Sequence, residues 1–128
     1  MPRRIHVSRG RFRRYVDRAI AALPPQFGAA ADNLLVVVEN LPVPEDRIQD
    51  DRDRLDPRVP LFGVYRGVPV AARAEGYTAV GPDVIAVFRR PLLRHCRSRK
   101  HLQDEIHRTV LHEFGHYLGL DEAAVEHL

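Results

Sequence analysis

The chain has little of what marks oxidised or membrane-embedded proteins. Cys96 is its single cysteine, so an internal disulfide is excluded and the compartment need not be oxidising. No apolar run approaches the roughly 18 to 20 residues of a membrane span, and Pro2, Arg3 and Arg4 stand where a signal peptide would lead into an apolar stretch. We therefore expect a cytoplasmic protein with no membrane partner.

The composition is that of one folded domain. Hydrophobic residues make up 45% of the 128 residues and charged residues 29%, which is typical of soluble globular proteins of this size. We expect a single domain over residues 1–128, with a flexible segment at 1–8. Residues 44–60 are almost all charged residues, prolines and turn formers, so this stretch is expected to be a charged surface loop.

The N-terminal region is rich in arginine although the net charge is only +3. Between Ser8, a candidate helix cap, and Pro24, the apolar residues recur at helical spacing: Phe12, Tyr15, Val16, Ala19, Ile20 and Leu23. Arginines occupy the opposite face of this expected helix. We favour a solvated face of a packed helix, and a patch for nucleic acid or an acidic partner is the alternative.

Three apolar stretches predict strands. The runs Leu34–Val38 and Val84–Phe88 are short and rich in β-branched residues, and the first is expected to be buried on both faces. Leu61–Tyr65 and Val68–Val70 flank a turn-like Arg66-Gly67 pair, which indicates a strand and a short return.

A second helix is expected between Ser98, its cap, and Gly119, which accepts the left-handed backbone at a helix end. Its apolar positions recur every four residues and should face the sheet: Leu102, Ile106, Val110, Phe114 and Leu118. His112 and His116 lie about 200° around the helix from Val110 and Phe114, so they open on another side.

The segment from His112 to His116 reads H-E-x-x-H. Histidines four residues apart on a helix share one face, which is the spacing that one zinc ion needs from two imidazoles. Glu113 can then act as general base toward a zinc-activated water. After Gly119 the chain can bring back Asp121 or Glu122 as a third ligand. The alternative is an amphipathic helix with two solvated histidines.

Other polar residues have weaker patterns. Glu105, Arg108 and Thr109 share the side of His112 and are candidates for contacts to the metal-binding residues, although an exposed Glu-Arg pair is commoner. Cys96, which stands among arginines, could have a lowered pKa or inhibit the site, but we favour an inert thiol. The remaining histidines are expected to be surface or packing residues: His6, His95, His101, His107 and His127.

The order of these segments, from about Phe12 to the C-terminus, resembles the small bacterial zincin-like proteins, sometimes called mini-zincins. The resemblance implies an α+β fold, a minimal zincin-like domain in which a small mixed sheet packs against an N-terminal helix and the H-E-x-x-H helix. That family's pattern reads H-E-x-x-H-x-x-G-x-x-D. It implies His112, His116 and Glu122 as zinc ligands, with Asp121 as the alternative third ligand, and Glu113 as the base.

Two features depart from related patterns. Glu122 stands where the family has aspartate, and Asp121 precedes it. Metzincins share the same frame but place a methionine turn beneath the metal, and the single methionine here is Met1.

The resemblance implies a zinc metallopeptidase whose substrate is a peptide or protein. We expect the substrate to lie along Val84–Phe88 as an edge strand. One alternative is a non-catalytic or regulatory binding module that keeps the metal-site scaffold and binds nucleic acid through the arginine-rich helix. A metal-dependent nuclease is disfavoured, because a related family of ribosomal RNA maturation nucleases has glycine at the position of Glu113.

Overall fold

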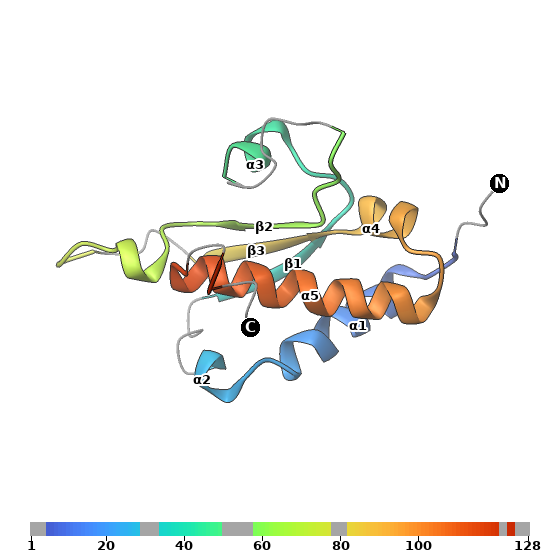
Figure 1. Ribbon diagram of the computed structural model, residues 1–128, viewed down its shortest axis with the longest axis horizontal. Coiled ribbons are helices and arrows are strands. Elements are labelled where there is room, and N and C mark those ends of the chain that lie inside the picture. The colour runs from blue at the N-terminus through green and yellow to red at the C-terminus, as the bar shows by residue number, and fades with distance from the viewer. Residues whose placement is uncertain (1–4, 29–33, 50–57, 78–81, 121–122, 125–128) are drawn as a thin grey trace.

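The computed structural model describes residues 5–28, 34–49, 58–77, 82–120 and 123–124. Its sheet has the strand order β1-β3-β2. Strand β1 (Leu34–Glu39) runs parallel to β3 (Asp83–Phe88), and β2 (Gly63–Arg66) runs antiparallel to it. In Figure 1, helices α1 (Arg9–Ala21) and α5 (Arg99–Leu118) lie below the sheet and α3 (Pro44–Gln49) lies above it. This mixed sheet with helices confirms the expected small α+β domain.

Shorter elements connect these layers. Helix α2 (Pro25–Gly28) follows α1, and the 3-10 helix η1 (Val70–Ala72) follows β2. Helix α4 (Arg89–His95) continues directly from β3 and leads into α5. In the part of the chain that the structure describes, no helix combines the length and the apolar character needed to cross a membrane.

Strand β3 forms the centre of the core. Ile85 and Val87 pack in the main cluster with α1 and α5, while Ala86 and Phe88 belong to a smaller cluster on the other face. All four side chains are fully buried. Burial on both faces therefore describes β3.

The same expectation is wrong for Leu34–Val38. Strand β1 is an edge strand, and the side chain of Leu35 is 51% exposed. An edge strand has a neighbouring strand on one side only, so its side chains are covered less completely than those of the central strand. The expectation that Val84–Phe88 offers a free edge to a substrate is wrong for the complementary reason, since β3 has neighbours on both sides.

Helix α1 forms as its sequence predicts. The Ser8 hydroxyl accepts a hydrogen bond from the Arg11 amide (3.1 Å), which caps the first turn. Phe12 and Val16 are fully buried against the main core. The Arg13 guanidinium donates to the Val36 carbonyl (2.6 Å), so this arginine ties α1 to the edge strand.

The N-terminal segment is more ordered than expected. Val7 is 5% exposed and joins the main core, and Arg89 donates to its carbonyl (3.1 Å). The expectation of a flexible segment is therefore wrong for residues 5–8, because apolar burial and a backbone hydrogen bond fix them. Residues 1–4 lie outside the described part.

The charged segment 44–60 begins with a helix, which corrects the expectation of a loop for its first six residues, and residues 50–57 lie outside the described part. Residues 44–49 form α3, where Asp46 accepts a hydrogen bond from the Val43 amide (2.9 Å). Asp46 is 2% exposed and pairs with Arg66 (2.9 Å), which also holds Glu39 through two hydrogen bonds. These carboxylates raise the pKa of Arg66 further above its usual range. Opposite charges on β1, α3 and β2 thus let a highly charged segment pack.

The expected return strand at Val68–Val70 is wrong. The chain instead enters η1 after Pro69, which has no amide hydrogen for a strand ladder. The turn of η1 contacts the end of α5, where a Cβ added to Gly119 would lie 2.6 Å from the Cβ of Ala71.

Candidate metal centre

Helix α5 carries the H-E-x-x-H segment and has the predicted ends. The Ser98 hydroxyl accepts from the His101 amide (3.0 Å) at its start. Gly119 adopts a left-handed conformation (φ 86°) at its end, and the Leu120 amide donates back to the Gly115 carbonyl (3.0 Å). The expected ridge is confirmed, since Leu102, Ile106, Val110 and Phe114 are buried in the main core.

The two histidines lie together on one side of α5. The ring centroids of His112 and His116 are 4.4 Å apart, with the ring planes at 72°. One donor atom from each histidine and one from Glu113 all lie within 4.8 Å of one another. Helical spacing has therefore gathered two imidazoles and a carboxylate in one place.

Glu113 is buried, with 3% of the residue exposed, and its carboxylate contacts both β2 and His116. Its Oε1 accepts from the backbone amide of Tyr65 on β2 (3.1 Å) and lies 3.0 Å from Nδ1 of His116. A carboxylate next to Nδ1 favours the tautomer that carries the proton there, and Nε2 is then the nitrogen that can hold a metal.

Strand β2 approaches α5 closely at this point. A Cβ added to Gly63 would lie 2.6 Å from Cγ2 of Thr109 and 3.0 Å from the carbonyl oxygen of Ala86. Only glycine fits between the helix and the central strand without displacing them. Thr109, which was a candidate for a contact to the metal ligands, thus serves as the surface against which β2 rests.

Tyr65 connects the site to a polar cluster around β3. Its hydroxyl oxygen lies 3.0 Å from Asp83 Oδ1 and 2.9 Å from the Val68 carbonyl oxygen. Burial, and then the neighbouring Asp83, raise the pKa of the Tyr65 hydroxyl, which therefore stays protonated and donates. Arg73 pairs with Asp83, and its guanidinium lies over the ring of Tyr117 at 5.8 Å from the centroid.

Sequence reasoning missed Gly63 and the Tyr65 amide as parts of the site. The predicted strand Leu61–Tyr65 includes both residues, but their contacts to α5 join positions up to 48 residues apart. A backbone amide has no signature in the sequence. The glycine inside an apolar run was a signal for a close backbone approach, and it could have been read as one.

Asp121 and Glu122, the two alternatives for the third ligand, lie outside the described residues. Within the described part, α5 ends at Leu118, and the chain changes direction at Gly119, three residues after His116. Imidazole is a ligand that zinc accepts, and the donor atoms of His112 and His116 lie within 4.8 Å of one another, so this pair fits that ion.

The other candidate residues do not join this site. Glu105 pairs with the exposed Arg108 (2.8 Å), the commoner arrangement of such a pair. Cys96 is 2% exposed, and burial together with the charge of Glu105 raises its thiol pKa to about 11. The interpretation of Cys96 as an inert thiol is confirmed, and the alternative of a lowered pKa is wrong.

Comparison with known proteins identifies the family of the chain but no individual relative. No curated protein matches the sequence. The family model described as zincin-like metallopeptidase matches residues 31–128, which include the sheet, α4 and the whole of α5. This range covers most of the chain and ends beyond the histidine pair. The chain therefore belongs to the zincin-like metallopeptidase family.

Proposed function

We propose that the protein is a zinc-dependent peptidase that hydrolyses peptide bonds in a peptide or protein substrate. His112 and His116 would hold the ion, with Glu122 or Asp121 as the third ligand. The observation that supports the proposal is the buried Glu113 carboxylate, which lies within 4.8 Å of the donor atoms of both histidines. A glutamate with no chemical role would not be expected to stay buried beside two imidazoles.

Each residue has a distinct role in this proposal. When bound, zinc would lower the pKa of a water molecule and polarise the scissile carbonyl. Glu113 would take a proton from that water and deliver it to the leaving amine. Its Oε1 accepts from the Tyr65 amide and lies 3.0 Å from Nδ1 of His116, and these contacts would orient the carboxylate for the transfer.

The Tyr65 amide would act as a positioning group. Because its hydrogen bond comes from the backbone of β2, the carboxylate of Glu113 is oriented by the sheet and not only by its own helix. Precise orientation of a general base contributes directly to the rate. The proposal thus gives β2 a part in the chemistry as well as in the fold.

Glu113→Gln tests this proposal. Glutamine has the same shape and can still accept from the Tyr65 amide, but it cannot take a proton. We expect cleavage of a denatured protein substrate, followed by mass spectrometry of the fragments, to fall on the order of 10³-fold while zinc content stays near wild type. Asp104→Asn is the matched control, because Asp104 is an exposed acid on the same helix that pairs with Lys100.

Three results would contradict the proposal. Equal cleavage by wild type and Glu113→Gln would remove the general base. Salt-dependent RNA binding that a chelator leaves unchanged, with no cleavage of peptides, would favour the binding module. RNA degradation that is sensitive to chelation would favour the nuclease.

A further inference from the structure

A second group of metal-ligating side chains lies at the junction of α4 and α5. His95 is the last residue of α4, and His101 and Glu105 stand on the first turns of α5. One donor atom from each lies within 4.8 Å of the others. Both histidines are surface or packing residues by sequence alone, because no spacing within one helix connects them.

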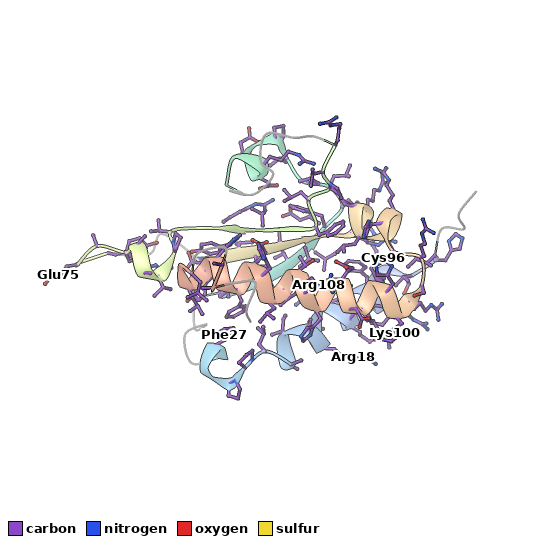
Figure 2. All side chains as sticks on the ribbon, viewed as in Figure 1. Arg18, Phe27, Glu75, Cys96, Lys100 and Arg108 are labelled. Carbon is purple, nitrogen blue, oxygen red and sulfur yellow. The ribbon has the colours of Figure 1, made fainter. Side chains whose placement is uncertain are left out.

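The fold brings these residues together across a helix break. Cys96, whose amide donates to the Leu92 carbonyl (2.9 Å), ends α4 and is buried in the main core. The chain then turns and starts α5 at the Ser98 cap. As a result the rings of His95 and His101 lie 5.4 Å apart, centroid to centroid. Figure 2 labels Cys96 beside α4 and Lys100 on the first turn of α5, on either side of this junction.

Glu105 completes the group from the same helix face as His101. The two residues are four positions apart, and His101 Nε2 lies 3.8 Å from Glu105 Oε1. On the other side, the Phe62 ring packs against His95 with centroids 5.1 Å apart. The position of His95 is therefore supported by the segment that leads into β2.

The donor set and its spacing suit a divalent transition metal. Zinc accepts two imidazoles and one carboxylate, with bonds near 2.0–2.2 Å that place tetrahedral ligand atoms roughly 3.4 Å apart. The observed 3.8 Å between His101 and Glu105 needs only a small side-chain adjustment. His95 is exposed, and the side chains of His101 and Glu105 are 38% and 13% exposed, so an ion and a water ligand can enter from solvent.

Two existing interactions oppose the ion. The Arg97 amide donates to His101 Nδ1 (3.3 Å), and binding through Nε2 would move the imidazole proton to Nδ1 and break that hydrogen bond. Arg108 pairs with Glu105 at 2.8 Å and would have to share it. We therefore expect weaker binding here than at His112 and His116.

The two groups are independent. His101 and His112 are eleven residues apart on one straight helix, roughly 16 Å along its axis, which is too far for a shared ion. We infer that His95, His101 and Glu105 form a second site, for a divalent transition-metal ion such as Zn²⁺, which links α4 to α5. An ion there would hold the helix junction, and no part of this inference depends on peptidase activity.

Zinc binding to purified full-length protein tests the inference. His116→Ala is used as background to disable the H-E-x-x-H site, and Zn²⁺ alone is the probe, by isothermal titration and by elemental analysis after dialysis. We expect about one zinc per chain in this background. Adding His101→Ala or Glu105→Gln should weaken binding at least about 10-fold. His107→Ala is the matched control, because His107 is an exposed histidine on α5 that belongs to neither group.

The opposing results are equally definite. No zinc in the His116→Ala protein would overturn the inference, and so would zinc that His101→Ala leaves unchanged or that His107→Ala removes to the same extent. A thermal readout makes the test independent of affinity fitting. Zinc should raise the Tm of His116→Ala by about 5 °C and leave that of His116→Ala/His101→Ala unchanged. An equal rise in both proteins would contradict a link between α4 and α5.

Discussion

The two ends of α5 carry the same three donor types in different surroundings. At the C-terminal end, Glu113 is buried and receives a hydrogen bond from β2. At the N-terminal end, His95 is exposed and Glu105 pairs with an exposed arginine. Under the proposals for the two groups, the same ligand chemistry would position a proton acceptor at the buried end and would only hold an ion at the exposed end. The two groups contain the same residue types and differ in burial and in hydrogen-bond partners.

Outside the proposed peptidase reaction, the largest expected effect concerns Cys96, which follows His95 directly and is buried in the main core. Its thiol pKa is raised from 9.0 to about 11, so near pH 8 the folded protein has about 100-fold less thiolate than the unfolded chain. We expect alkylation by iodoacetamide to be at least that much slower in native protein than in 8 M urea. Because Cys96 is the single cysteine, the reaction reports this position alone.

The same thiol gives a pH dependence with a definite sign. A folded-state pKa above the unfolded value means that the native state prefers the neutral thiol. The resulting stabilisation is complete below about pH 9 and is lost as the pH rises through about 11. Urea denaturation of wild type and Cys96→Ser between pH 8 and pH 11 measures it. Parallel decreases in the two proteins would show that Cys96 is not responsible.

Gly63→Ala is expected to destabilise the contact between β2 and the part of α5 that carries His112, Glu113 and His116. The added Cβ would meet Thr109 Cγ2 and the Ala86 carbonyl oxygen, and overpacking of this kind costs about 2–3 kcal/mol of the free energy of unfolding. Denaturation in urea measures the loss.

A double-mutant cycle identifies the cause of that loss. Thr109→Ser removes the nearer contact, so Gly63→Ala/Thr109→Ser should recover part of the stability that Gly63→Ala loses. Gly10→Ala is the control, since a Cβ there meets nothing within 4 Å. A loss at Gly10 as large as that at Gly63 would exclude the contact with α5 as the cause.

The pairing of His112 with His116 could be predicted because it depends only on residues within one helix. Ser98, the apolar ridge and Gly119 define α5 by short-range rules, and His112 and His116 follow from helical periodicity. The group of His95, His101 and Glu105 could not be predicted, since His95 and His101 come together only through the turn between α4 and α5. In the same way, β1 and β3 look alike as sequence, and only the strand order shows which of them is central.

The charged segment shows the limit of composition as a guide. Pro44–Gln49 was expected to be a loop because it is polar, yet Asp46 is buried by its pairing with Arg66. A charged side chain stays in solvent unless a partner of opposite sign is fixed nearby, and the partner of Asp46 is Arg66 on strand β2. Polarity alone therefore could not reveal α3.

Ser98→Ala is the smallest of the expected effects. Loss of the hydrogen bond from the His101 amide should cost about 1 kcal/mol of unfolding free energy. The substitution should also weaken zinc binding by His95, His101 and Glu105, because His101 is in the first turn of α5. Ser8→Ala, which removes the equivalent cap of α1, controls for a general loss of helix stability. Equal effects of both variants on zinc binding would show that the junction itself is not needed.

The hydrogen bond from the Tyr65 amide to Glu113 can form only in the folded domain, whereas the pairing of His112 with His116 requires only the helix. Two imidazoles at adjacent turns can capture a metal ion as soon as that turn of helix forms, even transiently in a chain that is otherwise unstructured. The carboxylate of Glu113 is oriented only after β2 has packed against α5, because the Tyr65 amide that binds it is 48 residues away in the sequence. If the proposed function is correct, a preparation could carry its full complement of metal and still contain many inactive molecules. The metal content of a sample would then report the local helix, and its turnover would report the folding of the whole domain.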